Sequence, residues 1–338
     1  MLMEISCAFP TTLDSPEHVA LAEELGYERA WLYDTPQQSP DVWMMLALAA
    51  GRTDRIGLGP GVLVPTLRHP MVNAAATAAL AALAPDRVAV AFGTGFTGRR
   101  AMGYRAIPWS YMDAYIRAYR GLLRGETIEW EGARMRMLHP PSHAAPRPVD
   151  VPVIVAALGP KGRAVAHELA DGLYVTLSIP EFAKEFSRVS YLFWGTVLDD
   201  GEDPRSERVR AAGGPGLALA YHGAYEFNAP LSELPGGAEW QAVVERTLPA
   251  ERHLAVHELH CVGLNEADRA GWGAGGYAML EQATLSGTVD QVSARLGDLA
   301  SVGVTELVYQ PCGPDIRREL EVFIATAKPA VAASEERT

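Results

Sequence analysis

The chain has 338 residues, of which 48% are hydrophobic, and a formal net charge of −12 at pH 7. This length suits a globular protein with a large core, and the acidic balance excludes nucleic acid and an anionic membrane surface as expected partners, since both select a concentrated positive face. Cys7, Cys261 and Cys312 are widely spaced and odd in number, which favours a reducing compartment. With no export signal and no apolar run of membrane-spanning length, we expect a cytoplasmic protein that binds a small molecule.

Apolar, β-branched runs alternate along the chain with stretches suited to helices. Eight runs are predicted as strands: residues 4–9, 28–33, 56–64, 87–92, 152–157, 172–176, 216–221 and 305–309. Helix start signals with proline in the first turn precede several of the intervening helices, as at Pro16, Pro40, Pro70 and Pro160. Eight such units favour a single α/β domain over residues 1–338, a (β/α)8 TIM barrel, with an open doubly wound sheet as the alternative.

Two intervals are too long for a bare connection between strands. Residues 94–150 hold an extra predicted helix at 111–123 and a predicted hairpin at 127–137, with its turn at Glu131-Gly132. Residues 222–303 hold further helical stretches. Loops that follow barrel strands build the mouth of the barrel, so we expect these insertions, after strands 4 and 7, to form the wall or lid of an active site.

The third predicted strand is unusual, because residues 57–61 contain three glycines and a proline before a helix that begins at Pro70. Strand interiors normally exclude glycine and proline, so their presence indicates that something approaches the backbone closely. A ligand shelf and an ordinary barrel bulge both fit this pattern.

Residues 55–70, the Ala-rich stretch 71–84, the strand 87–92 with Gly93-Thr94-Gly95 after it, and Gly159-Pro160-Lys161-Gly162 together resemble the luciferase-like oxidoreductase family. That family comprises bacterial luciferase, FMN-dependent monooxygenases and reductases that use the deazaflavin coenzyme F-420. The resemblance covers most of residues 3–180 and resumes over 286–323. It implies a homodimer with a TIM-barrel fold.

The resemblance also implies a cofactor. The Leu-Gly-x-Gly-Val and Arg-His-Pro patterns between Leu58 and Pro70 look closest to the methylenetetrahydromethanopterin reductase branch, which implies hydride transfer with coenzyme F-420 on a small organic substrate. Two alternatives stay open: an FMN-dependent monooxygenase that uses reduced flavin and O2, and a non-redox barrel that binds a phosphorylated ligand.

The cofactor-binding residues follow from the same resemblance. Family members often hold a non-proline cis peptide in the third strand that supports the flavin ring, and the matching bond here is Gly61-Val62. Gly159, Pro160, Lys161 and Gly162 follow a strand and open a helix, so their backbone N–H groups suit a phosphate. Ordinary turn chemistry gives the same sequence. Gly93, Thr94 and Gly95 are expected to contribute from the neighbouring loop.

Catalytic candidates are fewer. Asp34 is expected at the barrel mouth, where burial would raise its pKa and suit it to proton transfer; a turn or cap role is the alternative. His69 is a second candidate, or simply the residue before a helix start. Pterin-reductase relatives are expected to carry a carboxylate near the end of the first strand, where this chain has Cys7.

The remaining candidates are assigned on position. We expect Cys7, Tyr221, His222 and Gln310 in the substrate pocket. The spacing of His253, His257 and His260 invites a metal site, but the chain lacks the His-Glu-x-x-His order of zinc proteases, and we expect no metal.

Overall fold

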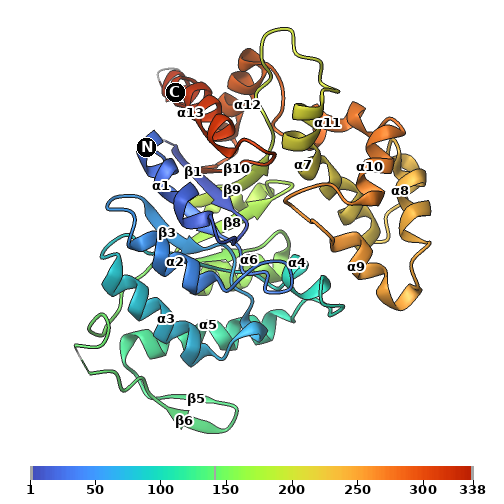
Figure 1. Ribbon diagram of the computed structural model, residues 1–338. Helices are drawn as coiled ribbons and strands as arrows, with labels where there is room; N and C mark the ends of the chain where they lie inside the picture. Colours follow the sequence, from blue (N-terminus) through green and yellow to red (C-terminus); the bar gives the residue numbers. More distant parts are fainter. Residues whose placement is uncertain (1–2, 141, 336–338) are drawn as a thin grey trace.

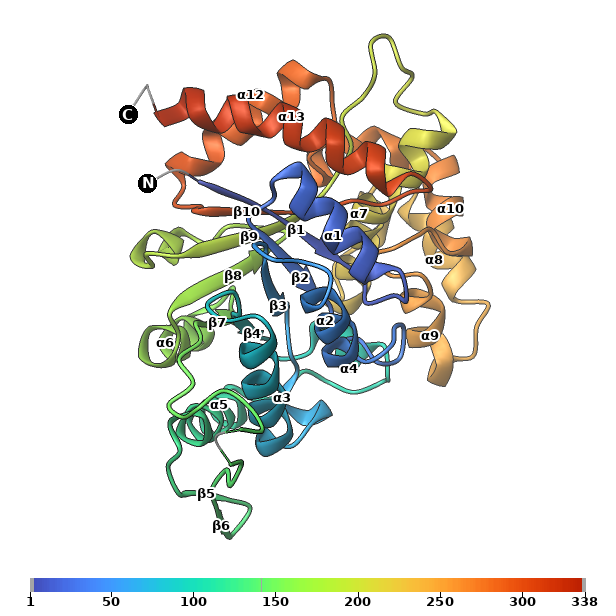
Figure 2. The same cartoon turned by 60° about the vertical axis from the view of Figure 1, so that its left-hand side comes forward.

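The computed structural model describes residues 3–140 and 142–335, and its centre is an eight-stranded parallel sheet in the order β3-β2-β1-β10-β9-β8-β7-β4 (Figures 1 and 2). The strands are β1 (Glu4–Phe9), β2 (Arg29–Leu32), β3 (Gly57–Pro60), β4 (Val90–Phe92), β7 (Val153–Ala156), β8 (Gly172–Thr176), β9 (Val189–Trp194) and β10 (Glu306–Gln310). Bridges Leu58–Val88 and Leu63–Phe92 join β3 to β4 and close the sheet. The predicted barrel is therefore confirmed.

Helices cover the outside of this barrel, as Figure 2 shows. They are α1 (Ser15–Leu25), α2 (Val42–Ala50), α3 (Pro70–Leu83), α5 (Trp109–Arg124), α6 (Pro160–Leu169), α12 (Val289–Ser301) and α13 (Ile316–Glu335). Proline lies in the first turn of α1, α3 and α6, where its missing N–H costs no helical hydrogen bond. Among the described residues, no helix is both long and apolar enough to cross a membrane.

The first insertion follows β4, as predicted. It contains α4 (Phe96–Arg100), then α5, and then the antiparallel pair β5 (Ile128–Trp130) and β6 (Ala133–Met135). Glu131 and Gly132 form the turn with φ of 51° and 77°. Both central residues are left-handed, which is the geometry that matches the twist of a two-residue hairpin.

The seventh barrel strand was wrongly predicted. Residues 216–221 lie inside α7 (Glu207–Glu226), and the strand is β9, which the sequence pattern did not reveal. Most of α7 between Ala212 and Leu219 is buried, so its apolar residues show no helical periodicity. Its glycines permit this close packing, since a Cβ on Gly216 would lie 2.4 Å from the Cβ of Trp194.

The second insertion therefore begins directly after β9, at residue 195, and ends before α12 at 289, in place of the predicted 222–303. Its helices are α7, α8 (Gly237–Val244), α9 (Arg252–His257), α10 (Glu266–Gly273) and α11 (Leu280–Ala283), with short 3-10 turns between them. They gather on one side of the barrel (Figure 1). They also form their own hydrophobic cluster, which includes Tyr221, Trp240 and Trp272.

Two other clusters form the core of the barrel. The larger one lies between the sheet and the outer helices, and the smaller one fills the barrel with residues that include Ala8, Trp31 and Tyr174. Glu306 is the first residue of β10 and is 1% exposed, so it lies at the end of the barrel where the strands begin. It accepts a hydrogen bond from Trp31 Nε1 at 3.0 Å and pairs with Arg188 at 3.3 Å. The barrel is a packed core with an ionic plug at the end where its strands begin.

Candidate active site at the barrel mouth

All eight strands are parallel, so their carboxyl ends meet at one mouth. On the side formed by β3, β4 and β7, the chain presents the small residues Gly61, Gly93 and Ala156, with Val62 between them. A Cβ on Gly93 would lie 2.5 Å from Val62 Cγ2, and one on Gly61 would lie 3.0 Å from the Cβ of Trp31. A side chain at either position would have to displace its neighbours, so close packing requires glycine at both. Among Gly61, Val62, Gly93 and Ala156, no side chain is larger than valine.

The backbone of this surface has the predicted form. The Gly61-Val62 peptide bond is cis, and the regular part of β3 ends one residue earlier, at Pro60. Gly59 has a different explanation, because a Cβ there would lie 2.1 Å from the carbonyl oxygen of Ala89 on the neighbouring strand. The glycines of this segment thus both allow close packing: Gly59 against the backbone of Ala89, and Gly61 against the side chain of Trp31.

Large side chains fill the opposite side of the mouth. The Tyr33 hydroxyl donates to Gln310 Oε1, and Gln310 Nε2 donates to the carbonyl oxygen of Cys261 at 2.5 Å. Trp194 Nε1 donates to the same carbonyl at 3.3 Å. Cys261 comes from the second insertion, so a segment far away in the sequence lies against the ends of β9 and β10 at the mouth. Gln310 lies at the mouth as predicted.

Asp34 lies just after β2 and is 3% exposed. Arg68 Nη1 donates to both of its carboxylate oxygens, at 2.8 and 2.7 Å, and Arg68 Nη2 donates to Asp41 at 2.7 Å. Burial raises the pKa of Asp34, as expected, and the Arg68 guanidinium opposes that rise. Since Arg68 engages both oxygens, the carboxylate ties the loop after β3 to the end of β2.

His69 is the N-cap of α3, where its Nδ1 accepts a hydrogen bond from the Met71 backbone N–H at 3.1 Å. The side chain is exposed and packs edge-on against Trp130, with ring centroids 6.2 Å apart. This is the structural role that the sequence offered as the alternative to catalysis.

The predicted phosphate site is a pair of adjacent loops, because β4 and β7 are neighbours in the sheet. Gly159 is the N-cap of α6, with open space where a Cβ would be, and Lys161 in the first turn is exposed. Gly162 is needed for packing, since a Cβ there would lie 2.5 Å from the Trp109 ring. Gly95 caps α4 with φ of 88°. The first turn of α6 thus presents backbone N–H groups and a lysine to this end of the mouth.

Two predicted pocket residues lie elsewhere. Cys7 belongs to the cluster between the sheet and the outer helices, together with Ile5 and Phe9, and it is fully buried there. Tyr221 belongs to the core of the second insertion, where its hydroxyl donates to the Pro235 carbonyl at 2.6 Å. Neither position supports a substrate contact. Cys7 faces outward because residues alternate across a strand, and Ala8 is the neighbour that points into the barrel.

His222, by contrast, belongs to a buried chain of hydrogen bonds that the sequence did not predict. His222 Nδ1 lies 2.6 Å from His260 Nδ1, His222 Nε2 lies 2.9 Å from Asp268 Oδ1, and His260 Nε2 lies 3.1 Å from Thr97 Oγ1. His257 instead pairs with Glu226 at 3.0 Å. Within residues 3–140 and 142–335, no group of three or more His, Cys, Asp or Glu side chains is placed to hold a metal ion.

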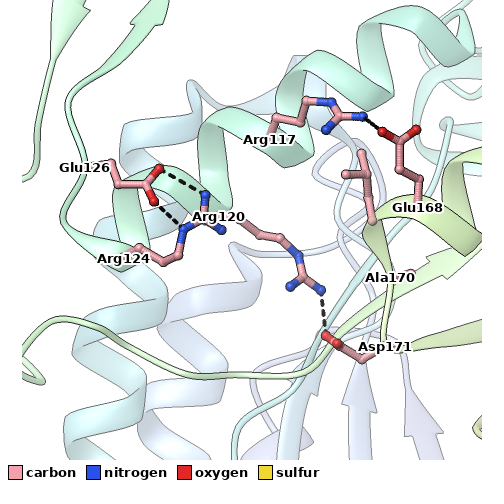
Figure 3. A pocket seen from close by; sticks show the side chains of 8 residues that line it. Arg117, Arg120, Arg124, Glu126, Glu168, Ala170 and Asp171 are labelled. Atoms are coloured by element: carbon pink, nitrogen blue, oxygen red, sulfur yellow. Dashed lines mark hydrogen bonds and ion pairs between the residues drawn. The ribbon is translucent and has the colours of Figure 1, made fainter.

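A surface pocket of about 490 Å³ lies away from the mouth, between α5 and the ends of α6 and the loop before β8 (Figure 3). Its arginines face carboxylates: Arg117 pairs with Glu168, and Arg120 pairs with Asp171 at 2.6 Å. Asp171 precedes β8, so the pocket opens at the end where the strands begin. In a TIM barrel that end serves stability, and the mouth serves catalysis.

The family model described as luciferase-like monooxygenase matches residues 12–189, more than half of the chain. The chain belongs to this family. The 5,10-methylenetetrahydromethanopterin reductase of Archaeoglobus fulgidus is 26% identical over 336 residues, which cover 90% of this chain and 92% of that protein. The F420-dependent glucose-6-phosphate dehydrogenase of Beutenbergia cavernae is 32% identical over 174 residues, which cover 47% of this chain and 51% of that protein.

The fold has the same neighbours. The coenzyme F420 dependent tetrahydromethanopterin reductase of Methanopyrus kandleri superimposes with a TM-score of 0.71 at 20% identity, covering 96% of this chain and 99% of that one. The likeness in fold extends beyond residues 12–189, the part that the family model matches.

Proposed function

We propose that this protein is an oxidoreductase that transfers a hydride between coenzyme F-420 and a small organic substrate. The observation that carries the proposal is the side of the barrel mouth formed by Gly61, Gly93 and Ala156 beside Val62, where three neighbouring positions carry no side chain larger than a methyl group. A planar tricyclic ring needs such a surface. When bound, the deazaflavin supplies the two-electron chemistry, and the protein supplies orientation and exclusion of water.

The residues that would hold the cofactor come from three loops, which follow β3, β4 and β7. Gly61 and Val62 would support the ring, and the N-terminus of α6 would receive the phosphate through the N–H groups of its first turn and through Lys161. Thr94 and Gly95, in the neighbouring loop, complete this end of the site. The N-cap position at Gly159 has no side chain to compete with an anion, which fits this assignment.

The protein's own side chains would position the reactants. Asp34 and Asp41 hold Arg68, and Arg68 is part of the loop that carries Gly61 and Val62, so the ion triad fixes the cofactor surface. We propose this positioning role for Asp34 because Arg68 engages both of its oxygens. Tyr33 and Gln310 would present polar groups across the mouth, where the substrate has to lie.

The test is titration of the purified chain with F-420 and, separately, with FMN, followed by absorbance and fluorescence. We expect binding of F-420 and at least tenfold weaker binding by Gly93→Ala, because its Cβ would lie 2.5 Å from Val62 Cγ2 and Val62 would have to move. Gly223→Ala is the matched control, since a Cβ at Gly223 meets nothing within 4 Å. Preferred binding of FMN would favour the monooxygenase alternative, and binding of neither cofactor would contradict both redox functions.

We further propose a cytoplasmic homodimer. The three cysteines are free and buried, which fits a reducing compartment. Met44 and Leu48 on α2, and Val72 on α3, are 64%, 46% and 51% exposed, which fits an apolar face covered by a second copy. Sedimentation of the purified chain tests the oligomeric state, and a monomer at micromolar concentration would contradict the proposal.

A further inference from the structure

The segment Leu259–Cys261 is the part of the second insertion that enters the barrel mouth. Cys261 is 8% exposed and packs with Trp194 and Cys312 in the cluster that fills the barrel. Its carbonyl oxygen accepts from Trp194, Gln310 and Cys312. Cys261 lies at the ends of β9 and β10, across the mouth from Gly61 and Gly93. Its position therefore suits a wall of the substrate pocket and not a support of the cofactor.

The backbone of this segment is in a conformation that has to be enforced. Leu259 and Cys261 have φ of 55° and 67°, the left-handed region that residues with a side chain seldom adopt. Two such residues within three positions persist only where the surroundings determine them. The residue between them, His260, is 3% exposed and carries the side-chain contacts that can do so.

The direction of each bond in this series of hydrogen bonds follows once the proton of His222 is placed on Nε2, next to the Asp268 carboxylate. The Asp268 carboxylate accepts from the backbone N–H of Asn265 at 3.1 Å and from Trp240 Nε1 at 2.8 Å, groups that can only donate. It therefore also accepts from His222 Nε2, which leaves His222 Nδ1 as an acceptor. His260 Nδ1 must then donate to His222, and His260 Nε2 accepts from the Thr97 hydroxyl.

The hydrogen bonds from Asp268 through His222 and His260 to Thr97 join parts of the molecule that are remote in sequence. Asp268 is fixed at the start of α10 by a capping box with Asn265, and Thr97 lies on α4, directly after the loop that carries Gly93 and Gly95. Burial lowers the pKa of His260, as do the neighbouring His222 and His257, which keeps its ring neutral and able to accept from Thr97. His260 is the only link of the chain that belongs to the turn itself.

We propose that His260 is a positioning residue: through Asp268, His222 and Thr97 it holds the Cys261 turn in the barrel mouth, as the wall that confines substrate against the cofactor. The second half of this statement rests on the proposed function. These hydrogen bonds fix the position of the second insertion relative to α4. The distance between the two sides of the mouth is therefore set by side chains that touch neither substrate nor cofactor.

The test measures alkylation of each cysteine by iodoacetamide, mapped by mass spectrometry, in the intact protein. Thr97→Val removes the hydroxyl at constant volume and leaves His260 Nε2 without its donor; Thr97→Ser keeps the hydroxyl and is the matched control. We expect alkylation of Cys261 to rise about tenfold in Thr97→Val, the effect of one unsatisfied buried acceptor, and to stay at the wild-type rate in Thr97→Ser. We expect a larger rise in the alkylation of Cys261 in His260→Phe than in Thr97→Val.

Cys7 reports on global unfolding, because it lies in the core of the barrel wall. If Cys7 reacts as fast as Cys261 in His260→Phe, that variant has unfolded. The alkylation rate of Cys261 in Thr97→Val then decides whether His260 is a positioning residue. An unchanged rate at Cys261 in folded Thr97→Val, or equal rates in the Val and Ser variants, would overturn the positioning role.

Addition of saturating F-420 separates the two halves of the proposal. We expect it to slow alkylation of Cys261 in Thr97→Val several-fold and to leave Cys7 unchanged. If F-420 binds without protecting Cys261, the turn is no wall of that site. If wild type does not bind F-420 at all, the proposed function fails, and the alkylation rates without cofactor still decide the role of His260.

Discussion

Replacement of Arg68 by methionine should destabilise the protein through the charge that it leaves behind. Arg68 is the ionic partner of Asp34, whose side chain is 1% exposed, and methionine keeps the aliphatic volume but removes the cation. Removal of one partner from a buried pair costs about 3–5 kcal/mol. Asp41 is 39% exposed and adds at most about 1 kcal/mol, because water replaces the lost contact.

The expected shift in melting temperature follows from the size of the chain. An unfolding entropy of about 2.1 cal/mol/K per residue gives about 0.7 kcal/mol/K for 338 residues, so the loss at Asp34 corresponds to a decrease in Tm of about 4–7 °C. Differential scanning calorimetry at pH 7 measures this shift. The double variant Asp34→Asn with Arg68→Met should melt above Arg68→Met alone, since the amide leaves no buried charge.

The pH dependence of stability is a second test of this explanation. Burial raises the pKa of Asp34 above 3.8 in the folded protein, and the loss of Arg68 removes the groups that oppose the rise. A carboxyl with a raised folded-state pKa is penalised above that pKa, and the penalty disappears as the pH falls through it. The gap between Arg68→Met and wild type should therefore narrow from pH 7 toward pH 5. A gap below 1 °C at pH 7, or a double variant less stable than Arg68→Met, would refute the reasoning.

Three further predictions concern other parts of the molecule. Gly159→Asp should stabilise the fold by about 1 kcal/mol as an N-cap, yet weaken F-420 binding at least tenfold by occupying the anion site. Gly159→Ala, the control, should neither stabilise the fold nor weaken binding. Calorimetry measures the stability and cofactor titration the binding, and undiminished binding by the Asp variant would place the phosphate elsewhere. Burial lowers the pKa of His260, so acidification below pH 6.5 should destabilise wild type more steeply than His260→Phe, by up to about 1.4 kcal/mol per pH unit; equal slopes in urea unfolding would contradict this. Glu306→Leu should cost about 3 kcal/mol or more in urea unfolding because Arg188 loses its buried partner, and a neutral result would show that the plug is dispensable.

Most of the barrel was predictable because its strands are short, buried and separated by helices with proline start signals. The seventh strand was not, because α7 is buried on several sides and its run from Gly216 to Tyr221 has the composition of a buried strand. Periodicity cannot separate a fully buried helix turn from a strand of the same length. The strand β9 was missed although its Val, Tyr, Phe and Trp residues favour a strand, because the run at 216–221 was assigned as the seventh strand in its place.

The candidate site divides in the same way. The small residues Gly61 and Gly93 are readable in the sequence, because glycine in a strand or directly after it has few explanations, and their role in cofactor binding stays a prediction. The outward direction of Cys7 was also readable, since Ile5 and Phe9 share its face of β1 and the small residue Ala8 does not. The hydrogen-bond chain through His260 was out of reach, because its members come from four separate segments that only the tertiary fold brings together.

The second insertion packs around Trp240 and Trp272, and two of its residues, Leu219 and Cys261, also pack in the cluster that fills the barrel. If the insertion forms the wall proposed above, substitutions around Trp240 and Trp272 should alter that side of the entrance first. Residues 195–288 would then be the first to sample in directed evolution toward a new reactant, because the proposed cofactor side of the mouth comes from other parts of the chain.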